Sequence, residues 1–214
     1  MSDLKQLSSR PRVTPQPVPK IGKSERTRAT ILNAALDFIW SHPFREMTVN
    51  EVMQPIGLSR AAFYQYFTDL HAVIEALLAT LRDEILAVAS PWLVGTSDPV
   101  ELLDESLTGL VRICYRRGPI LRAVADAAAT DERLDLAWKE FLHGFDEAVA
   151  GRIALDQERG LIPRFEPMPV AVALNRLDAF TFIDAFGQRP RNRPEPVLMA
   201  IRRIWMGALY KAQD

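Results

Sequence analysis

Apolar residues recur every three or four positions along most of the chain, and this spacing places them on one face of an α-helix. No stretch alternates between apolar and polar residues for long enough to predict a sheet. With Pro and Gly marking the ends of the periodic stretches, the pattern predicts an all-helical protein of about nine helices. They are expected at residues 24–41, 48–57, 59–66, 69–90, 99–118, 119–130, 131–160, 170–186 and 195–212.

Residues that favour helix ends lie at several of these boundaries. Three are predicted N-caps: Ser24, Asp98 and Asp131. Pro91 is expected to stop the fourth helix, because proline in a helix interior removes a hydrogen bond. Gly118 is expected to end the fifth helix, since glycine is common just past a helix end. Pro55 is expected to shorten the second helix.

The composition is that of a soluble, folded protein. Hydrophobic residues make up 48% of the 214 positions and charged residues 25%, which is enough for a sizeable core. No apolar run approaches the roughly 20 residues that span a bilayer, and the N-terminus lacks the apolar segment of a secretory signal. We therefore expect a cytoplasmic protein without a membrane partner. The single cysteine, Cys114, excludes an intrachain disulfide and a cysteine metal cluster.

Positive charge is concentrated at the N-terminus. Residues 1–28 contain seven Lys or Arg and two acidic residues, whereas the whole chain has a net charge of −1. Residues 1–23 also contain four prolines and no apolar periodicity, so we expect a flexible, basic, proline-rich arm there. Such an arm favours a polyanionic partner, although a solvated tail can have the same composition.

The residues from Thr48 to Phe67 have the layout of a helix-turn-helix. Thr48 is followed three residues later by Glu51, the pattern of a capping box. Gly57 permits a sharp turn, and the helix after it directs Phe63 and Phe67 inward and small or polar residues outward. Small residues at its start let the backbone approach base edges. We expect residues 24–68 to form a DNA-binding domain and residues 69–214 a helical ligand-binding and dimerisation domain.

This segment resembles the signature of the TetR family of bacterial regulators. The matching positions are Thr48, Val52, Gly57, Leu58, Ser59, Phe63, Tyr64, Tyr66 and Phe67. The resemblance implies a homodimeric regulator, expected to be a repressor, that binds a palindromic operator in duplex DNA and is released by a small apolar or amphipathic ligand. The family usually has a lysine where this chain has Leu70, which implies a lost phosphate contact that either weakens DNA binding or is replaced by the basic arm.

A second resemblance concerns the C-terminal part. The residues that carry it are Trp138–Gly160, Ala173–Asn175 and Ile204–Trp205. They are similar to the C-terminal domain of the mycobacterial regulators that control ethionamide activation.

The family resemblance and the helix geometry together assign roles in DNA binding. Arg60, Ala61 and Gln65 are expected to face base edges, where Arg suits guanine and Gln suits adenine. The expected DNA-contacting set is Thr48, Ser59, Arg60, Ala61, Ala62, Tyr64, Gln65 and Tyr66. Within it, Thr48, Ser59 and the two tyrosines are expected to contact phosphates. The alternative for Tyr64 and Tyr66 is a half-buried packing role.

A ligand pocket is predicted in the C-terminal part. Asn175 and Asp178 fall on a largely apolar helix, where buried polar groups need partners. They are either paired internally or serve as the few polar groups of an apolar pocket. Many of the apolar residues around them could equally be plain core. The expected lining is Trp92, Leu107, Leu110, Cys114, Trp138, Leu142, Phe145, Val149, Asn175 and Asp178.

The last two predicted helices are the expected dimer interface. Both are apolar over more than one face, which is more than one protomer core easily covers. The TetR resemblance implies a four-helix bundle between two protomers. On this basis an Ile201→Arg change is expected to produce a monomer.

Patterns for catalysis and metal binding are absent from the sequence. There is no glycine-rich phosphate loop, no G-x-S-x-G and no H-E-x-x-H. The pairs His71/Glu75 and His143/Glu147 have the spacing of metal ligands on a helix but lack a third ligand. We expect no metal, no cofactor and no enzymatic activity. The alternative function is a helical homodimer that binds a small molecule and carries a degenerate DNA-binding motif.

Overall fold

The structure, a computed structural model, describes residues 22–210, and every regular element in that range is helical. The expected all-helical class is confirmed. The α-helices are α1 (Lys23–Ile39), α2 (Val49–Met53), α3 (Arg60–Phe63), α4 (Leu70–Val94), α5 (Pro99–Ala128), α6 (Glu132–Glu158), α7 (Pro167–Phe186) and α8 (Pro194–Leu209). Two short 3₁₀ helices, η1 (Phe44–Glu46) and η2 (Gln54–Ile56), lie between α1 and α3.

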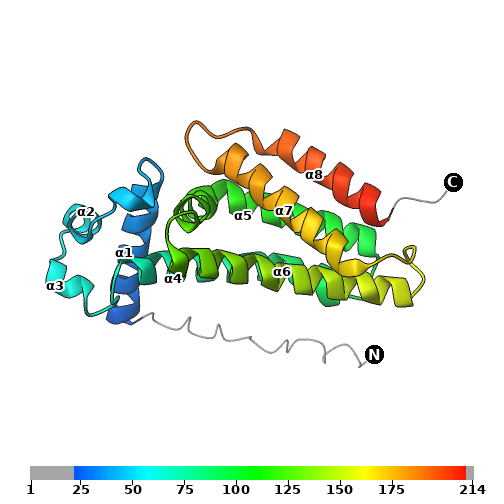
Figure 1. The fold of residues 1–214 in the computed structure, drawn as a ribbon, viewed down its shortest axis with the longest axis horizontal. Coiled ribbons are helices and arrows are strands. Elements are labelled where there is room, and N and C mark those ends of the chain that lie inside the picture. Colours follow the sequence, from blue (N-terminus) through cyan, green and yellow to red (C-terminus); the bar gives the residue numbers. More distant parts are fainter. Residues whose placement is uncertain (1–21, 211–214) are drawn as a thin grey trace, which may run out of the picture.

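The short helices gather at one end of the molecule and the long helices form a bundle at the other (Figure 1). Helix α5 contacts α4, α6, α7 and α8, so it lies at the centre of the bundle. In the small end, Val52 and Phe63 are fully buried and join α2 to α3. Figure 1 shows α8 along one edge of the bundle and α7 beside it, between α8 and α6. One connected set of buried apolar residues runs through both parts.

The break predicted at Gly118 and Pro119 is wrong, and residues 22–210 contain eight α-helices rather than nine. Helix α5 continues through both residues to Ala128. Proline cannot donate to the carbonyl four residues earlier, and that carbonyl, of Tyr115, accepts a hydrogen bond from Arg191 Nη1 at 2.5 Å. A Cβ at Gly118 would lie 2.2 Å from the Phe186 carbonyl oxygen. The glycine is therefore explained by the close approach of α5 and α7.

The stop predicted at Pro91 is also wrong, because α4 continues to Val94. The carbonyls of Trp92 and Gly95 at this end both accept hydrogen bonds from Arg152 Nη1 of α6. A buried cation thus satisfies carbonyl groups that the helix itself leaves unpaired.

Other boundaries differ by a few residues. The N-cap predicted at Ser24 is wrong: α1 begins at Lys23, its N-cap is Gly22, and the Gly22 N–H donates to the Glu25 carboxylate at 3.2 Å. The predicted arm, residues 1–23, lies outside the described residues apart from its last two. Helix α3 ends at Phe63, and the chain continues to Tyr66 as turns. Helix α2 ends at Met53, just before the 3₁₀ turn that contains Pro55, as expected. The last helix was expected to reach Ala212, but α8 ends at Leu209 and Tyr210 is its C-cap.

Candidate DNA interface and ligand cavity

The first candidate site consists of the short helices α2 and α3 and the turn between them. Thr48 Oγ1 accepts from the Glu51 N–H at 3.3 Å, and a Glu51 carboxylate oxygen accepts from the Thr48 N–H at 3.0 Å. Gly57 has φ 67° and ψ 24°, the left-handed conformation that favours glycine. Ser59 caps α3, since its Oγ accepts from the Ala62 N–H at 3.2 Å. The predicted capping box at Thr48 is confirmed.

The outer face of this segment is polar and accessible. Six of the eight expected DNA-contacting residues are exposed: Thr48, Ser59, Arg60, Ala61, Tyr64 and Gln65. Tyr64 is 50% exposed, and its hydroxyl accepts a hydrogen bond from Arg60 Nη2 at 3.3 Å. Tyr66 and Ala62 are half-buried and pack against the core. Of the two tyrosines, Tyr64 is therefore a surface residue, whereas Tyr66 has a packing role.

Three arginines connect the bundle to the end of α1. Arg122 of α5 donates from Nη2 to the Ile39 carbonyl oxygen at 2.6 Å. Arg189 and Arg191, in the loop between α7 and α8, lie over the ring of Trp40, with guanidinium carbons 4.9 and 5.2 Å from its centroid. The last turn of α1 is thus held by α5 and by the α7–α8 loop, both of which belong to the bundle.

A charged cluster joins the start of α4 to the start of α6. Arg133 donates to both carboxylate oxygens of Glu75, at 2.5 and 2.7 Å, and to Asp69 at 2.9 Å. His71 Nε2 lies 2.5 Å from Asp131 Oδ2, and this hydrogen bond is the main cause that lowers the pKa of Asp131. Helix α4, which begins just after the α3 segment, is fixed to α6 by these contacts. The residues His71 and Glu75, considered as metal ligands, have separate protein partners.

The second candidate site is a cavity of about 60 Å³ among α4, α5, α6 and α7. Six of the ten expected lining residues meet there: Leu110, Cys114, Leu142, Phe145, Asn175 and Asp178. Five further apolar residues complete the wall: Ile85, Leu121, Phe141, Ala179 and Phe182. Sequence reasoning missed these five because they lie on the same apolar stripes as ordinary core residues.

The other four expected lining residues are buried outside this cavity: Trp92, Leu107, Trp138 and Val149. Trp138 stacks on Phe141, with ring centroids 5.7 Å apart, so it lies behind the cavity wall. The Trp92 indole N–H donates to the Tyr210 hydroxyl at 2.9 Å, in a different network. The apolar period of a helix does not reveal which buried residue faces a hollow and which faces a neighbouring helix.

Asp178 is the titratable group of the cavity. Its carboxylate oxygens both lie 3.1 Å from the Trp205 indole nitrogen, which donates to them. Burial raises the pKa of Asp178 to about 7, and the Trp205 hydrogen bond opposes this shift only in part. Burial, and to a lesser extent the charge of Asp178, also raises the pKa of the Cys114 thiol. Cys114 is therefore a protonated wall residue at neutral pH and lacks the reactivity of a thiolate.

Asn175 is held by a residue that sequence reasoning did not identify. Its Nδ2 donates to Asp146 Oδ1 at 2.9 Å, and Arg176 donates to both Asp146 oxygens at 3.1 and 2.9 Å. Asp146 is buried on α6. It lies on the same helical face as Leu142 and Val149. A carboxylate within this apolar stripe is the sequence feature that could have identified it. The side-chain amide of Asn175 is oriented by this internal pairing.

A second buried polar network lies at the far end of the bundle. Arg152 and Asp156 form a fully buried ion pair on α6, with Nε to Oδ2 at 2.9 Å. The Tyr210 hydroxyl donates to the same Asp156 oxygen at 2.6 Å, and burial, then Asp156, raises the pKa of Tyr210. Trp92 lies beneath the Arg152 guanidinium, 5.6 Å from ring centroid to guanidinium carbon. The network joins α4, α6 and the residue that follows α8.

Metal ligands do not cluster in the part of the chain that the structure describes. Within residues 22–210, no three His, Cys, Asp or Glu side chains gather as a possible metal site. His143 and Glu147 form an exposed pair at 3.3 Å on α6. None of the helices between these limits combines the length and the apolar character needed to cross a membrane.

Comparison with known proteins gives matches over both parts. The model for the C-terminal domain of the transcriptional regulator EthR matches residues 103–211, and the model for bacterial regulatory proteins of the tetR family matches residues 31–77. The HTH-type transcriptional regulator EthR of Mycobacterium tuberculosis is 28% identical over 188 residues, which cover 84% of this chain and 85% of that protein. Its namesake in Mycolicibacterium smegmatis is 24% identical over 189 residues, 85% of each chain.

The fold has solved counterparts as well. A bacterial regulatory protein in the tetR family from Rhodococcus RHA1 has a TM-score of 0.72 with this chain at 14% sequence identity. The alignment covers 90% of this chain and 100% of that one. A protein with low sequence identity therefore shares the arrangement of a small helical end on a long helical bundle.

Proposed function

The chain belongs to the TetR family of bacterial regulatory proteins, with a C-terminal domain of the EthR type, and we propose that it is a repressor whose release from DNA is controlled by a small apolar ligand. DNA-binding transcriptional regulation follows from the family. The ligand response, the repressor role and the homodimer are the parts that we propose. One observation carries the proposal most directly: a polar outer face on the turn and helix after Gly57, backed by a fully buried Phe63.

The proposed DNA contacts use that face. Arg60, Ala61 and Gln65 are exposed on and just after α3, where they can reach base edges in the major groove. Thr48 and Ser59 lie at the N-termini of α2 and α3, where helix ends favour phosphate. Tyr64, whose hydroxyl accepts a hydrogen bond from Arg60, is proposed to contact the DNA backbone.

The proposed dimer forms through the outer faces of α7 and α8. Large apolar side chains are exposed there: Met168 and Phe180 on α7, Met199 and Ile204 on α8. Phe180 is 56% exposed and Met199 is 69% exposed. Large apolar side chains gathered on one exposed face are typical of a protein–protein interface. Ile201, by contrast, is fully buried within one protomer. An Ile201→Arg change would therefore disrupt the protomer itself, and Ile204→Arg is the appropriate probe of the dimer.

The proposed ligand response uses the cavity and α4. The cavity is apolar with two polar residues, Asn175 and Asp178, as is usual for small-molecule sites. Helix α4 contributes Ile85 to the cavity wall and begins at Leu70, directly after the proposed DNA-contacting segment. A ligand that fits one position of α4 better than another would change the separation of the two recognition helices in a dimer. Its effect on DNA affinity is limited to its differential affinity for the two states.

The test is a band-shift assay with DNA from the region upstream of the protein's own gene and a scrambled fragment of equal length. We expect a complex of dimer size on the first fragment, with log affinity falling by about 0.9 per neutralised phosphate for each unit of log salt. Equal affinity for both fragments would contradict operator recognition. Sedimentation of Ile204→Arg should give a folded monomer, while Leu136→Arg, at an exposed apolar residue of α6, should stay dimeric.

A further inference from the structure

Four charged residues form one stripe along helix α5. Glu101 and Glu105 lie in the first half of the helix, and Arg112 and Arg116 lie near its middle. Successive residues of an α-helix are rotated by about 100°, so these four positions fall within about 60° of one another around the helix axis. All four side chains are exposed. The α5 stripe is therefore negative at one end and positive at the other.

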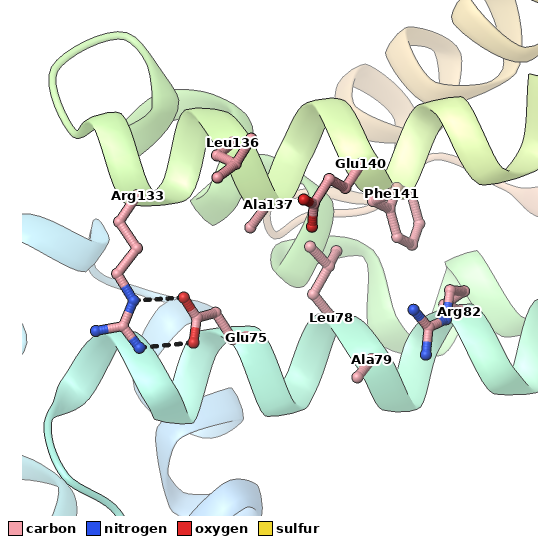
Figure 2. A pocket seen from close by; sticks show the side chains of 9 residues that line it. All are labelled: Glu75, Leu78, Ala79, Arg82, Arg133, Leu136, Ala137, Glu140 and Phe141. Atoms are coloured by element: carbon pink, nitrogen blue, oxygen red, sulfur yellow. Dashed lines mark hydrogen bonds and ion pairs between the residues drawn. The ribbon is translucent and has the colours of Figure 1, made fainter.

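None of these four side chains has a hydrogen-bond or ion-pair partner among the residues that the structure describes. Several charged side chains elsewhere in the bundle do have such partners. Figure 2 shows Arg133 donating to both carboxylate oxygens of Glu75. Arg117, next to the α5 stripe, donates to Glu84 of α4 at 2.8 Å. The charges of the stripe are thus available to groups from outside the protomer.

The charges of the stripe do not neutralise one another within the helix. With a rise of 1.5 Å per residue, Glu105 and Arg112 are about 10 Å apart along the helix axis, and Glu101 and Arg116 are about 22 Å apart. The closest neighbours in the stripe have the same charge and are four residues apart, a spacing at which like charges destabilise a helix. Opposite charges supplied by another molecule would remove this repulsion.

The order of the charges makes the stripe complementary to a second copy of itself. When two α5 helices lie antiparallel about a two-fold axis, Glu105 can face Arg112 of the partner subunit, and Glu101 can face Arg116 of the partner subunit. Both pairings have the same centre, between positions 108 and 109, so a single two-fold axis satisfies them together. A parallel arrangement in the same register would instead place like charges opposite each other.

The α5 stripe lies apart from the faces proposed for the α7–α8 dimer. Its two arginines border an open groove between α4 and α5, and its two glutamates border another between α5 and α8. Neither groove is lined by the four exposed apolar residues proposed for the dimer. The central residues of the stripe, Thr108 and Gly109, are small and leave room for the approach of a second helix.

We propose that the α5 stripe is a second self-association surface, through which two copies of this chain pair antiparallel and form four ion pairs. The contact is distinct from the dimer proposed above and would join one dimer to another. Each exposed ion pair contributes little and is weakened by salt. The association should therefore be weak, detectable in concentrated protein at low salt and absent from dilute solution.

The test measures weight-average mass by sedimentation equilibrium, from micromolar to near-millimolar protein. At low salt, the mass of the wild type should rise above that of the dimer as concentration increases, and high salt should restore the dimer. Glu101→Arg combined with Glu105→Arg makes the stripe entirely positive. Arg112→Glu combined with Arg116→Glu makes it entirely negative. Each variant alone should associate at least tenfold more weakly than the wild type, because four attractions become repulsions.

An equal mixture of the two variants is the decisive sample. Its positive and negative stripes match, so the association should return at least to the wild-type strength. Glu140→Arg combined with Glu147→Arg is the matched control, since it makes the same change of net charge at exposed positions of α6. This control should associate as the wild type does.

The α5 surface would be overturned by a mixture that associates no better than its separate components. An equal loss in the α6 control, or a wild type that does not associate further at low salt, would also overturn it. If the species present at high salt were a monomer, the α7–α8 dimer would be contradicted. The effects of charge reversal and mixing would still decide whether the α5 stripes pair.

Discussion

The two ends of the molecule place their polar side chains in opposite ways. At the α1–α3 end, the polar side chains proposed to contact DNA are exposed. The hydrogen bonds that they make within the protein join residues three or four positions apart in the chain. In the bundle, the residues Asp146, Arg152, Asp156 and Asp178 are all buried. The partners of Asp146 and Asp178 lie about 30 positions along the chain, on other helices. The first arrangement leaves polar groups available to a partner molecule, and the second uses them to hold helices together.

This difference predicts a division of effects. Substitutions at the small end should change DNA binding and leave the fold largely intact. Substitutions of buried polar groups in the bundle should change stability first, because a buried charge that loses its partner is strongly unfavourable. Four experiments test this division, beginning with the largest expected effect.

The largest effect is expected from the buried ion pair of α6. Asp156→Ala leaves the Arg152 guanidinium buried without its carboxylate and removes the acceptor of Tyr210. We expect the free energy of unfolding to fall by about 3–5 kcal/mol. Urea denaturation at a fixed protein concentration measures it.

The same helix supplies the control. Lys139 and Asp135 also form a pair with four-residue spacing, but at the surface, at 2.6 Å. Asp135→Ala should lower the free energy of unfolding by no more than about 1 kcal/mol. Equal losses in Asp156→Ala and Asp135→Ala would mean that burial does not distinguish the two pairs.

The second effect concerns pH. Burial raises the pKa of Asp178 to about 7, above its ordinary value of 3.8. Between these values the folded protein keeps the proton and the unfolded chain releases it, so stability falls as pH rises. From pH 5 to pH 7 the loss should be about 2 kcal/mol. Asp178→Asn removes this titration while its amide oxygen can still accept from Trp205. The variant should therefore gain stability relative to the wild type as pH rises, and a constant difference would contradict the shifted pKa.

The contrast also explains how much could be predicted from sequence. The helix-turn-helix could be predicted from sequence because its signals are local. Thr48 and Glu51 are three residues apart, and the left-handed backbone of Gly57 does not depend on contacts with the bundle. The helical stripes and several caps were likewise local. The continuation of α5 past Pro119 could not be predicted in this way. The Tyr115 carbonyl that Pro119 leaves unpaired accepts a hydrogen bond from Arg191, which lies in a loop 76 positions away in the chain.

The cavity shows the same limit. Asn175 and Asp178 were singled out as polar groups in an apolar helix, and both border the cavity. Their partners were not predictable, because Asp146 and Trp205 meet them only through helix packing. Trp92 shows the reverse case, since its aromatic character suggested a pocket residue and its indole instead donates to Tyr210.

The third effect lies at the small end. Arg60→Ala and Gln65→Ala should each reduce discrimination between operator variants by roughly 1–3 kcal/mol if the contacts are bidentate. Both residues are exposed, so the melting temperature should change little. Fluorescence anisotropy with single-base operator variants measures the discrimination. Tyr64→Phe is the comparison, because loss of a phosphate contact should weaken all sequences alike. If Arg60→Ala left the preference among variants unchanged, the recognition face would have been placed wrongly.

The smallest effect tests the contact through which the two ends meet at Trp40. The Arg189 guanidinium carbon lies 4.9 Å from the centre of that ring. Because Arg189 is exposed to solvent, its cation–π contact with the buried ring should contribute about 0.5–1 kcal/mol. Arg189→Ala should loosen α1 on the bundle and weaken operator binding about two- to fivefold, the same free energy expressed as affinity. Arg193→Ala is the matched control in the same loop, since Arg193 pairs with exposed Glu195. It removes the same charge but leaves Trp40 covered. Anisotropy titrations at two salt concentrations separate the causes, because general electrostatic attraction weakens with salt in both variants. If Arg189→Ala and Arg193→Ala weakened binding equally, positive charge alone would account for the loss, and the Trp40 contact would have no part in positioning the DNA-binding end.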